Sequence, residues 1–144
     1  MVGQFPDSAQ TTGDNHNQAG MMAAILETHP KIDRRVRRVL EIIHTDITRH
    51  HLVKDLAKEV NLSPDYLERK FHAVTRQGIT RYMQGLKLQK ACNLLISSFK
   101  SINEIAEEAG FHSLNYFDEV FHNHYGLTPS KYRQQFNNGA GQEK

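Results

Sequence analysis

The sequence contains one short pattern of apolar and small residues twice, about fifty positions apart. The first copy is Leu56, Ala57, Val60, Asn61, Leu62, Leu67 and Phe71, and the second is Ile105, Ala106, Ala109, Gly110, Phe111, Phe117 and Phe121. Two short helices joined by a tight turn form a helix-turn-helix, whose second helix can enter a groove of DNA. The repeat therefore predicts an all-α fold with two helix-turn-helix subdomains, each a homeodomain-like three-helix unit.

Length and composition limit the class of protein. The chain has 144 residues, of which 38% are hydrophobic and 24% charged, as in globular domains. No apolar run reaches the length of a membrane span, and the first residues lack the basic and apolar stretches of a secretory signal, so we expect a cytoplasmic protein. The single cysteine, Cys92, excludes an intrachain disulfide and cysteine-rich zinc sites.

Charge is distributed unevenly, although the formal net charge is only +2. Residues 30–100 contain 15 Lys or Arg and 7 Asp or Glu, a net charge of +8. Residues 101–133 contain 2 basic and 5 acidic residues, a net charge of −3. Because DNA phosphates attract the first region and repel the second, the two copies of the repeat are not equivalent partners for DNA.

The chain divides at changes in polarity and helical spacing. The first 20 residues are polar and cannot bury enough surface to offset ordering, although Met21 to Glu27 can form a short helix. The expected parts are 1–28, a flexible tail or linker remnant; 29–79, the first helix-turn-helix subdomain; 80–98, a linker helix; 99–136, the second subdomain; and 137–144, a frayed tail.

Several helix ends are marked by capping residues. Ser63 and Pro64 have the N-cap and N1 character of the first recognition helix. Ser101 and Glu104 form a capping-box pair, and Gly110 suits a left-handed turn. The linker helix, about 27 Å long at about 1.5 Å per residue, changes its apolar face midway, so it can pack against one subdomain and then the other.

These residues resemble the DNA-binding module of the AraC/XylS family of bacterial transcription regulators. The matching positions, from about Ile32 to Arg133, are Leu56, Ala57, Leu67, Phe71, Tyr82, Ile102, Ile105, Ala106, Ala109, Gly110, Phe111, Tyr116, Phe117, Phe121, Gly126, Pro129, Tyr132 and Arg133. The resemblance implies two helix-turn-helix subdomains on a rigid helix, with recognition helices in successive major grooves of DNA.

By position in the family pattern, the first reading surface consists of Asp65, Tyr66, Glu68, Arg69 and His72. Arg69 is the first candidate for a base contact, because a guanidinium can pair with O6 and N7 of guanine. Glu68 and Asp65 can accept from cytosine N4 or orient Arg69. The alternative for Arg69 is an exposed ion pair with Asp65 at i,i+4 spacing, which stabilises little.

The corresponding second surface is Leu114, Asn115, Asp118 and Glu119. The family commonly has a basic residue at the position of Glu119, and two carboxylates facing phosphates are unfavourable. Asn115 can still read adenine through two hydrogen bonds. Specific readout, weak docking on the DNA backbone and contact with a protein all remain open for this helix.

Arg76 also departs from the family, which usually has glycine after the first recognition helix. A left-handed Arg costs about 1 kcal/mol more than Gly, so we expect the turn to shift towards Gly78. The alternative is that Arg76 holds a phosphate. The candidates for phosphate contacts are Ser63, Arg76, Arg81, Ser113 and Lys131.

Other chemistry is less well supported by the sequence. Nine histidines invite a metal site, but histidines at i,i+2 on a helix, as in His122 and His124, point apart, so surface histidines are the better interpretation. Cys92 is read as a buried structural thiol in preference to a nucleophile. Without a phosphate loop or paired acid and base, the sequence predicts a protein that is not an enzyme and has no metal or cofactor.

Together these observations predict a sequence-specific regulator that binds double-stranded DNA mainly through the first recognition helix. The family implies that the second unit extends the footprint or contacts RNA polymerase. The alternative is a protein-interaction module, whose acidic second unit binds a partner while the basic first unit holds DNA nonspecifically. The sequence is equally compatible with a longer parent protein that has an upstream effector-binding or dimerisation domain and with a self-contained regulator.

Overall fold

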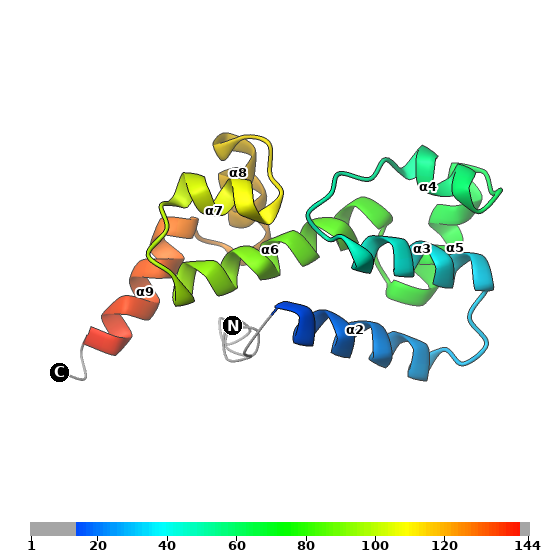
Figure 1. The fold of residues 1–144 in the computed structure, drawn as a ribbon, viewed down its shortest axis with the longest axis horizontal. Coiled ribbons are helices and arrows are strands. Elements are labelled where there is room, and N and C mark those ends of the chain that lie inside the picture. The colour runs from blue at the N-terminus through cyan, green and yellow to red at the C-terminus, as the bar shows by residue number, and fades with distance from the viewer. Residues whose placement is uncertain (1–13, 142–144) are drawn as a thin grey trace. The chain divides into compact units, whose positions relative to one another are not determined.

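The computed structural model describes the backbone of residues 14–141 and the side chains of residues 20–137, and these residues form helices joined by short turns (Figure 1). The helices are α2 (Asp14–Thr28), α3 (Arg34–Thr45), α4 (Val53–Glu59), α5 (Pro64–Thr75), α6 (Ile79–Ser97), α7 (Ile102–Ala109), α8 (Leu114–Tyr125) and α9 (Pro129–Gly141). The described residues are thus all-α, as the sequence predicted. None of the described helices is long and apolar enough to cross a membrane.

The chain forms two compact units, and the boundary between them in the sequence falls within α6, between Leu86 and Lys87. The N-terminal unit has a core built from α3, α4, α5 and the first half of α6, whereas the C-terminal unit has a core built from the second half of α6, α7, α8 and α9. The expected linker helix is therefore divided between two hydrophobic cores, because its apolar face changes midway.

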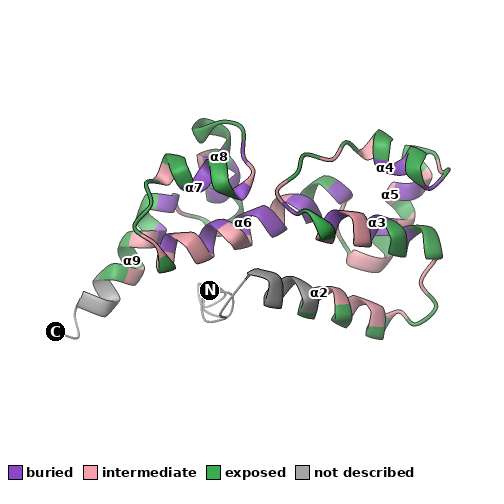
Figure 2. Cartoon of the chain, in the orientation of Figure 1, coloured by how far each residue is buried: buried purple, intermediate pink, exposed green. Residues whose placement is uncertain are grey.

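In the N-terminal unit, α3 packs against α5, and α4 packs against α5 (Figure 1). The buried residues lie on the inward faces of these helices, where Figure 2 colours them purple. Phe71 is fully buried, and its ring meets that of Tyr82 on α6 edge to face at a centroid distance of 5.3 Å. Tyr82 also contacts His44 of α3, with 2.5 Å between the hydroxyl and Nε2, so α3, α5 and α6 converge on one ring.

In the C-terminal unit, aromatic side chains fill the core. Phe117, Phe121 and Tyr132 are fully or almost fully buried, and successive rings lie 5.7 and 5.4 Å apart. Cys92 is buried beside Tyr125 and Tyr132, and burial raises the pKa of its thiol to about 11. A thiol that stays protonated in an apolar core is a structural residue, because the thiolate is the nucleophilic form.

Both expected tails differ from the structure in their described parts. Helix α2 begins at Asp14, and Met21, Met22 and Ile25 pack against the core of the N-terminal unit, so residues 21–28 are part of this unit. At the other end α9 continues to Gly141, because Phe136 packs on Tyr132 and anchors the helix beyond the expected boundary. The expectations for residues 1–13 and 142–144 lie outside the described residues.

Candidate nucleic-acid interface

The first helix-turn-helix consists of α4, a turn at Asn61 and α5. Asn61 has a φ of 60°, in the left-handed region that Asn tolerates better than most residues. Ser63 then caps α5, its hydroxyl accepting from the amide of Tyr66 at 3.2 Å, and Pro64 occupies the first turn. The caps that the sequence predicted are thus present, and they fix the direction in which α5 leaves the turn.

The outer face of α5 presents Asp65, Arg69 and His72 to solvent, while Leu67 and Phe71 are buried. Among the described residues, Arg69 forms no ion pair with Asp65; its guanidinium carbon lies 5.5 Å from the centroid of the Tyr66 ring. The structure therefore does not contain the i,i+4 ion pair that was the alternative role for Arg69. Asp65, Arg69 and His72 together form an exposed polar surface, which we call the α5 surface.

Glu68 does not belong to the α5 surface, although the sequence predicted that it would face away from the core. It is half-buried, and its carboxylate accepts from the amide of Ile79 at 3.1 Å. The first amides of a helix lack intrahelical partners, and a carboxylate at that end also interacts favourably with the helix dipole. Glu68 therefore caps α6 and fixes the angle between α5 and α6, and it is not placed to read a base.

The turn after α5 also differs from the expectation. Arg76 itself adopts the left-handed conformation, with a φ of 65° and ψ of 17°, and its amide donates to the carbonyl of His72 at 2.7 Å. The predicted shift towards Gly78 is wrong, because this backbone bond closes the helix at the usual place and holds Arg76 in a strained conformation. The side chain is exposed beside the C-terminal end of α5, and Arg81 is exposed on the first turn of α6.

The second helix-turn-helix is built in the same way from α7 and α8. Ser101 and Glu104 form the predicted capping box, with reciprocal bonds of 3.1 and 2.8 Å. Gly110 has a φ of 101°, and the hydroxyl of Ser113 accepts from the amide of Tyr116 at 3.0 Å to cap α8. The backbone of this motif therefore repeats that of the first one.

The outer face of α8 has a different character from that of α5. Leu114, Asn115 and Glu119 are exposed and Asp118 is half-exposed, so the predicted second reading surface is present but carries negative charge and apolar area. Leu114, Asn115, Asp118 and Glu119 are called the α8 surface below. Lys131 is exposed on the first turn of α9, where its amide donates to the hydroxyl of Thr128 at 3.2 Å.

Asp118 occupies the position in α8 that Glu68 occupies in α5, yet it has no capping role. The residue that corresponds to Ile79 is Pro129, which has no amide hydrogen to donate. Among the described residues, Asp118 makes no hydrogen bond or ion pair with a side chain or amide. The carboxylate of Glu68 therefore stabilises the fold, whereas that of Asp118 remains available on the surface.

Two cationic residues have structural roles that the sequence analysis did not assign. Arg133 donates through Nε to the carbonyl of Leu95 at 3.0 Å and through Nη2 to that of Ser98 at 3.1 Å, so it caps the C-terminal end of α6. Lys87 is almost fully buried with its ammonium 5.9 Å from the Phe111 ring, and burial lowers its pKa. The sequence signal for the burial of Lys87 was its position near the midpoint of α6, where the apolar face of the helix changes.

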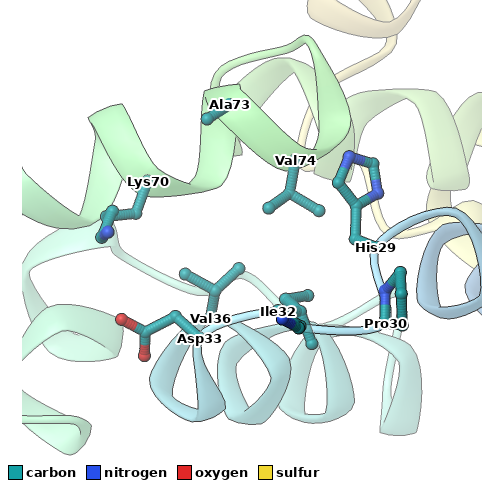
Figure 3. Close-up of a pocket in the computed structure, with 9 residues that line it drawn as sticks. His29, Pro30, Ile32, Asp33, Val36, Lys70, Ala73 and Val74 are labelled. Carbon is teal, nitrogen blue, oxygen red and sulfur yellow. The ribbon is translucent and has the colours of Figure 1, made fainter.

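A cavity of about 430 Å³ lies between the connection from α2 to α3 and the last turns of α5 (Figure 3). Asp33 and Lys70 lie at one end of it and His29 at the other, with Val36 and Val74 between them. The walls between these two ends are aliphatic.

The structure thus contains two capped helix-turn-helix motifs, each with an exposed recognition helix, which is the arrangement of a double helix-turn-helix DNA-binding domain. The pattern of a helix-turn-helix domain family matches residues 56–135, more than half of the chain. This chain belongs to the AraC/XylS family of transcription regulators.

Individual relatives agree with this assignment. The chain is 31% identical over 127 residues to the Msm operon regulatory protein of Streptococcus mutans, covering 82% of this chain and 46% of that protein. It is 34% identical over 101 residues to the transcriptional regulator GadX of Escherichia coli K12, covering 68% of this chain and 35% of GadX. A solved AraC-type regulator from Chromobacterium violaceum is 28% identical with a TM-score of 0.62, covering 72% of this chain and 92% of that one. The chain spans less than half the length of these curated relatives.

Proposed function

We propose that this chain is the part of a bacterial transcription regulator that binds a promoter sequence in double-stranded DNA mainly through the α5 surface. The observation that carries the proposal is that Arg69 is exposed, is paired with no carboxylate among the described residues, and is flanked by two other exposed polar side chains. A guanidinium that is not paired with a carboxylate can make two hydrogen bonds to guanine, which is the commonest specific contact in the major groove.

Charge supports the same assignment of roles. The region with a net charge of +8 includes α3, α4, α5 and the whole of α6. Positive charge provides the sequence-independent part of DNA affinity. Ser63, Arg76 and Arg81 are exposed in this region and are proposed phosphate contacts, as are Ser113 and Lys131 of the C-terminal unit. We place the regulator in the cytoplasm at the bacterial nucleoid, as part of a longer protein with an upstream effector-binding or dimerisation domain.

Sequence specificity is tested by comparing a duplex recovered from a random pool with a scrambled duplex of the same composition. Specific regulators bind their sites roughly 10³ to 10⁷ times more tightly than other DNA at physiological salt. We expect this chain to prefer the recovered duplex by a ratio within or approaching that range. A ratio near one would contradict the proposal.

Arg76 provides a test that separates stability from DNA binding. Arg76→Gly removes the strain of a left-handed residue with a side chain, so we expect the free energy of unfolding to rise by about 1 kcal/mol. If Arg76 contacts a phosphate, the same change makes the salt dependence of binding shallower. The slope of log affinity against log salt concentration, which is negative, then decreases in magnitude by about 0.9. Urea denaturation and binding titrations measure both, with Arg76→Lys as the control that keeps charge and strain. An affinity and a slope unchanged in Arg76→Gly would remove this residue from the interface.

The α8 surface has an accessory role in this proposal, because Glu119 repels phosphates. Glu119→Arg is expected to strengthen DNA binding and to steepen the salt dependence by about 0.9, since one phosphate contact is added. The matched control is Glu107→Arg on the exposed face of α7, which changes net charge equally outside the recognition helix. If the two variants have the same salt dependence as the parent, α8 does not approach DNA.

A second candidate function for the C-terminal unit is contact with a protein such as RNA polymerase. Among the described residues, large apolar side chains are exposed at four positions, and Phe99, Leu114 and Tyr116 of these are in the C-terminal unit. Exposed apolar area near carboxylates is a feature of protein contacts rather than of DNA contacts. The double variant Phe99→Ser and Leu114→Ser should then reduce transcription activation without reducing DNA affinity, as measured in a reconstituted transcription assay.

A further inference from the structure

Three cationic side chains from two helices gather around the ring of Tyr66. The guanidinium carbons of Arg35, on α3, and Arg69, on α5, lie 5.9 and 5.5 Å from the ring centroid, and the ammonium of Lys70 lies 5.5 Å from it. Cations within about 6 Å of an aromatic centroid are attracted to the electron-rich face of the ring. Tyr66 therefore holds together charges that would otherwise repel one another.

Arg35 is also held from its other side by Asp33. The carboxylate of Asp33 accepts from Nε of Arg35 at 3.1 Å, from Nη2 at 2.9 Å and from the backbone amide of Arg35 at 2.8 Å. These bonds with Arg35, and the nearby charge of Lys70, lower the pKa of Asp33 to about 2. Asp33 is thus ionised at neutral pH, and it orients Arg35 through Nε and Nη2, so Nη1 is not bonded to Asp33.

The group remains strongly positive after Asp33 is counted. Three cations and one carboxylate give a net charge of +2. The other acidic residues of α5 do not neutralise it, because Glu68 is committed to the amide of Ile79 and Asp65 makes no ion pair among the described residues. The side chain of Tyr66 also accepts a hydrogen bond from Arg35. The donors that remain for an anion are those of Lys70 and the N–H groups of Arg35 that are not bonded to Asp33 or Tyr66.

We propose that Arg35 and Lys70, positioned by Tyr66 and Asp33, bind a backbone phosphate of DNA beside the α5 surface. This inference rests on the proposed function, because the phosphate belongs to the wall of the groove that α5 reads. A guanidinium and an ammonium that converge from two helices match the charge and the acceptor oxygens of a phosphate diester. Tyr66, which the sequence presented as a base contact, becomes a positioning residue, and Arg69 connects the phosphate-binding group to the reading surface.

Arg35→Gln and Lys70→Gln test the proposal on the selected duplex and on its scrambled counterpart at several salt concentrations. On both duplexes, each change is expected to reduce the magnitude of the negative slope of log affinity against log salt concentration by about 0.9. The ratio of the two affinities should stay unchanged. Arg38→Gln is the matched control, because Arg38 is an exposed arginine on the same helix whose Nη1 lies 3.7 Å from Glu41. An equal loss of slope in Arg38→Gln, or no loss in Arg35→Gln and Lys70→Gln, overturns the proposal.

Folding and positioning are controlled separately. Urea denaturation identifies any variant that loses stability, and Arg35→Lys keeps the charge and should retain most of the salt slope. Tyr66→Phe keeps the ring but removes the hydroxyl that bonds Arg35, so it should retain most of the salt dependence of the parent. Tyr66→Leu removes both contacts and should show the same reduction in salt dependence as the two glutamine variants. Equal behaviour of Tyr66→Phe and Tyr66→Leu contradicts the positioning role. If the parent does not distinguish the two duplexes, the proposed regulator function fails, but the salt slopes on nonspecific DNA still decide the phosphate site.

Discussion

Arg69→Ala is expected to lose about 1–3 kcal/mol of binding free energy on the selected duplex, between roughly 5-fold and 150-fold in affinity. The loss should be much smaller on scrambled DNA, because a bidentate base contact exists only where guanine is correctly placed. Fluorescence anisotropy titrations of both duplexes at one salt concentration measure the difference.

Two variants make this experiment specific to the geometry of Arg69. Arg69→Lys keeps the charge but not the planar fork of donors, so it should lose selectivity while retaining affinity for scrambled DNA. Glu119→Ala changes the corresponding residue of α8, and it should alter selectivity little if the α5 surface is the principal reader. An equal loss of affinity by Arg69→Ala on every duplex would mean that Arg69 contacts only the backbone.

Phe71→Ala is expected to lower the free energy of unfolding by about 3–5 kcal/mol, because it removes a fully buried ring that packs on Tyr82. Phe121 occupies the equivalent position in α8, is also fully buried and contacts Tyr132, so Phe121→Ala should have a cost of similar size. Urea denaturation followed by circular dichroism measures both losses.

The two phenylalanine variants should differ in DNA binding although they resemble each other in stability. Loss of the N-terminal core disorders the α5 surface, so Phe71→Ala should abolish selectivity for the selected duplex. Phe121→Ala should leave a measurable preference, because the N-terminal unit has its own core. If Phe121→Ala removes selectivity as completely as Phe71→Ala, the assignment of one principal reader is wrong.

The features that the sequence predicted well depend on residues close together in the chain. Ser63 caps the amide three residues later, and Ser101 and Glu104 bond each other across one turn, so each signal is complete within a few positions. The repeat of apolar residues likewise determines which faces of the recognition helices are buried.

The features that the sequence did not reveal depend on contacts between distant segments. The role of Glu68 depends on the position of Ile79, and the position of Arg35 against Tyr66 depends on how α3 packs on α5. Arg76 shows a different limit of prediction from sequence. The backbone hydrogen bond that closes α5 outweighs the preference of about 1 kcal/mol for glycine in the left-handed conformation. Only tertiary structure therefore separates Glu68, which caps α6, from the exposed candidates Asp65, Arg69 and His72.

The duplicated motif thus supports two different surfaces on one backbone plan. Arg69 on α5 corresponds to Glu119 on α8, and the capping carboxylate Glu68 corresponds to the uncommitted carboxylate Asp118. Shared core positions preserve the fold, whereas the exposed positions determine whether a recognition helix attracts or repels phosphates. We therefore infer one principal DNA-reading helix and one accessory helix.

Selection of bound duplexes from a random pool, followed by sequencing, tests this inference most directly. The account predicts one contiguous block of strongly enriched base pairs, and enrichment for guanine within it should disappear when the selection is repeated with Arg69→Ala. Two blocks of equal strength separated by roughly one helical turn of 10–10.5 base pairs, both unaffected by Arg69→Ala, would contradict it.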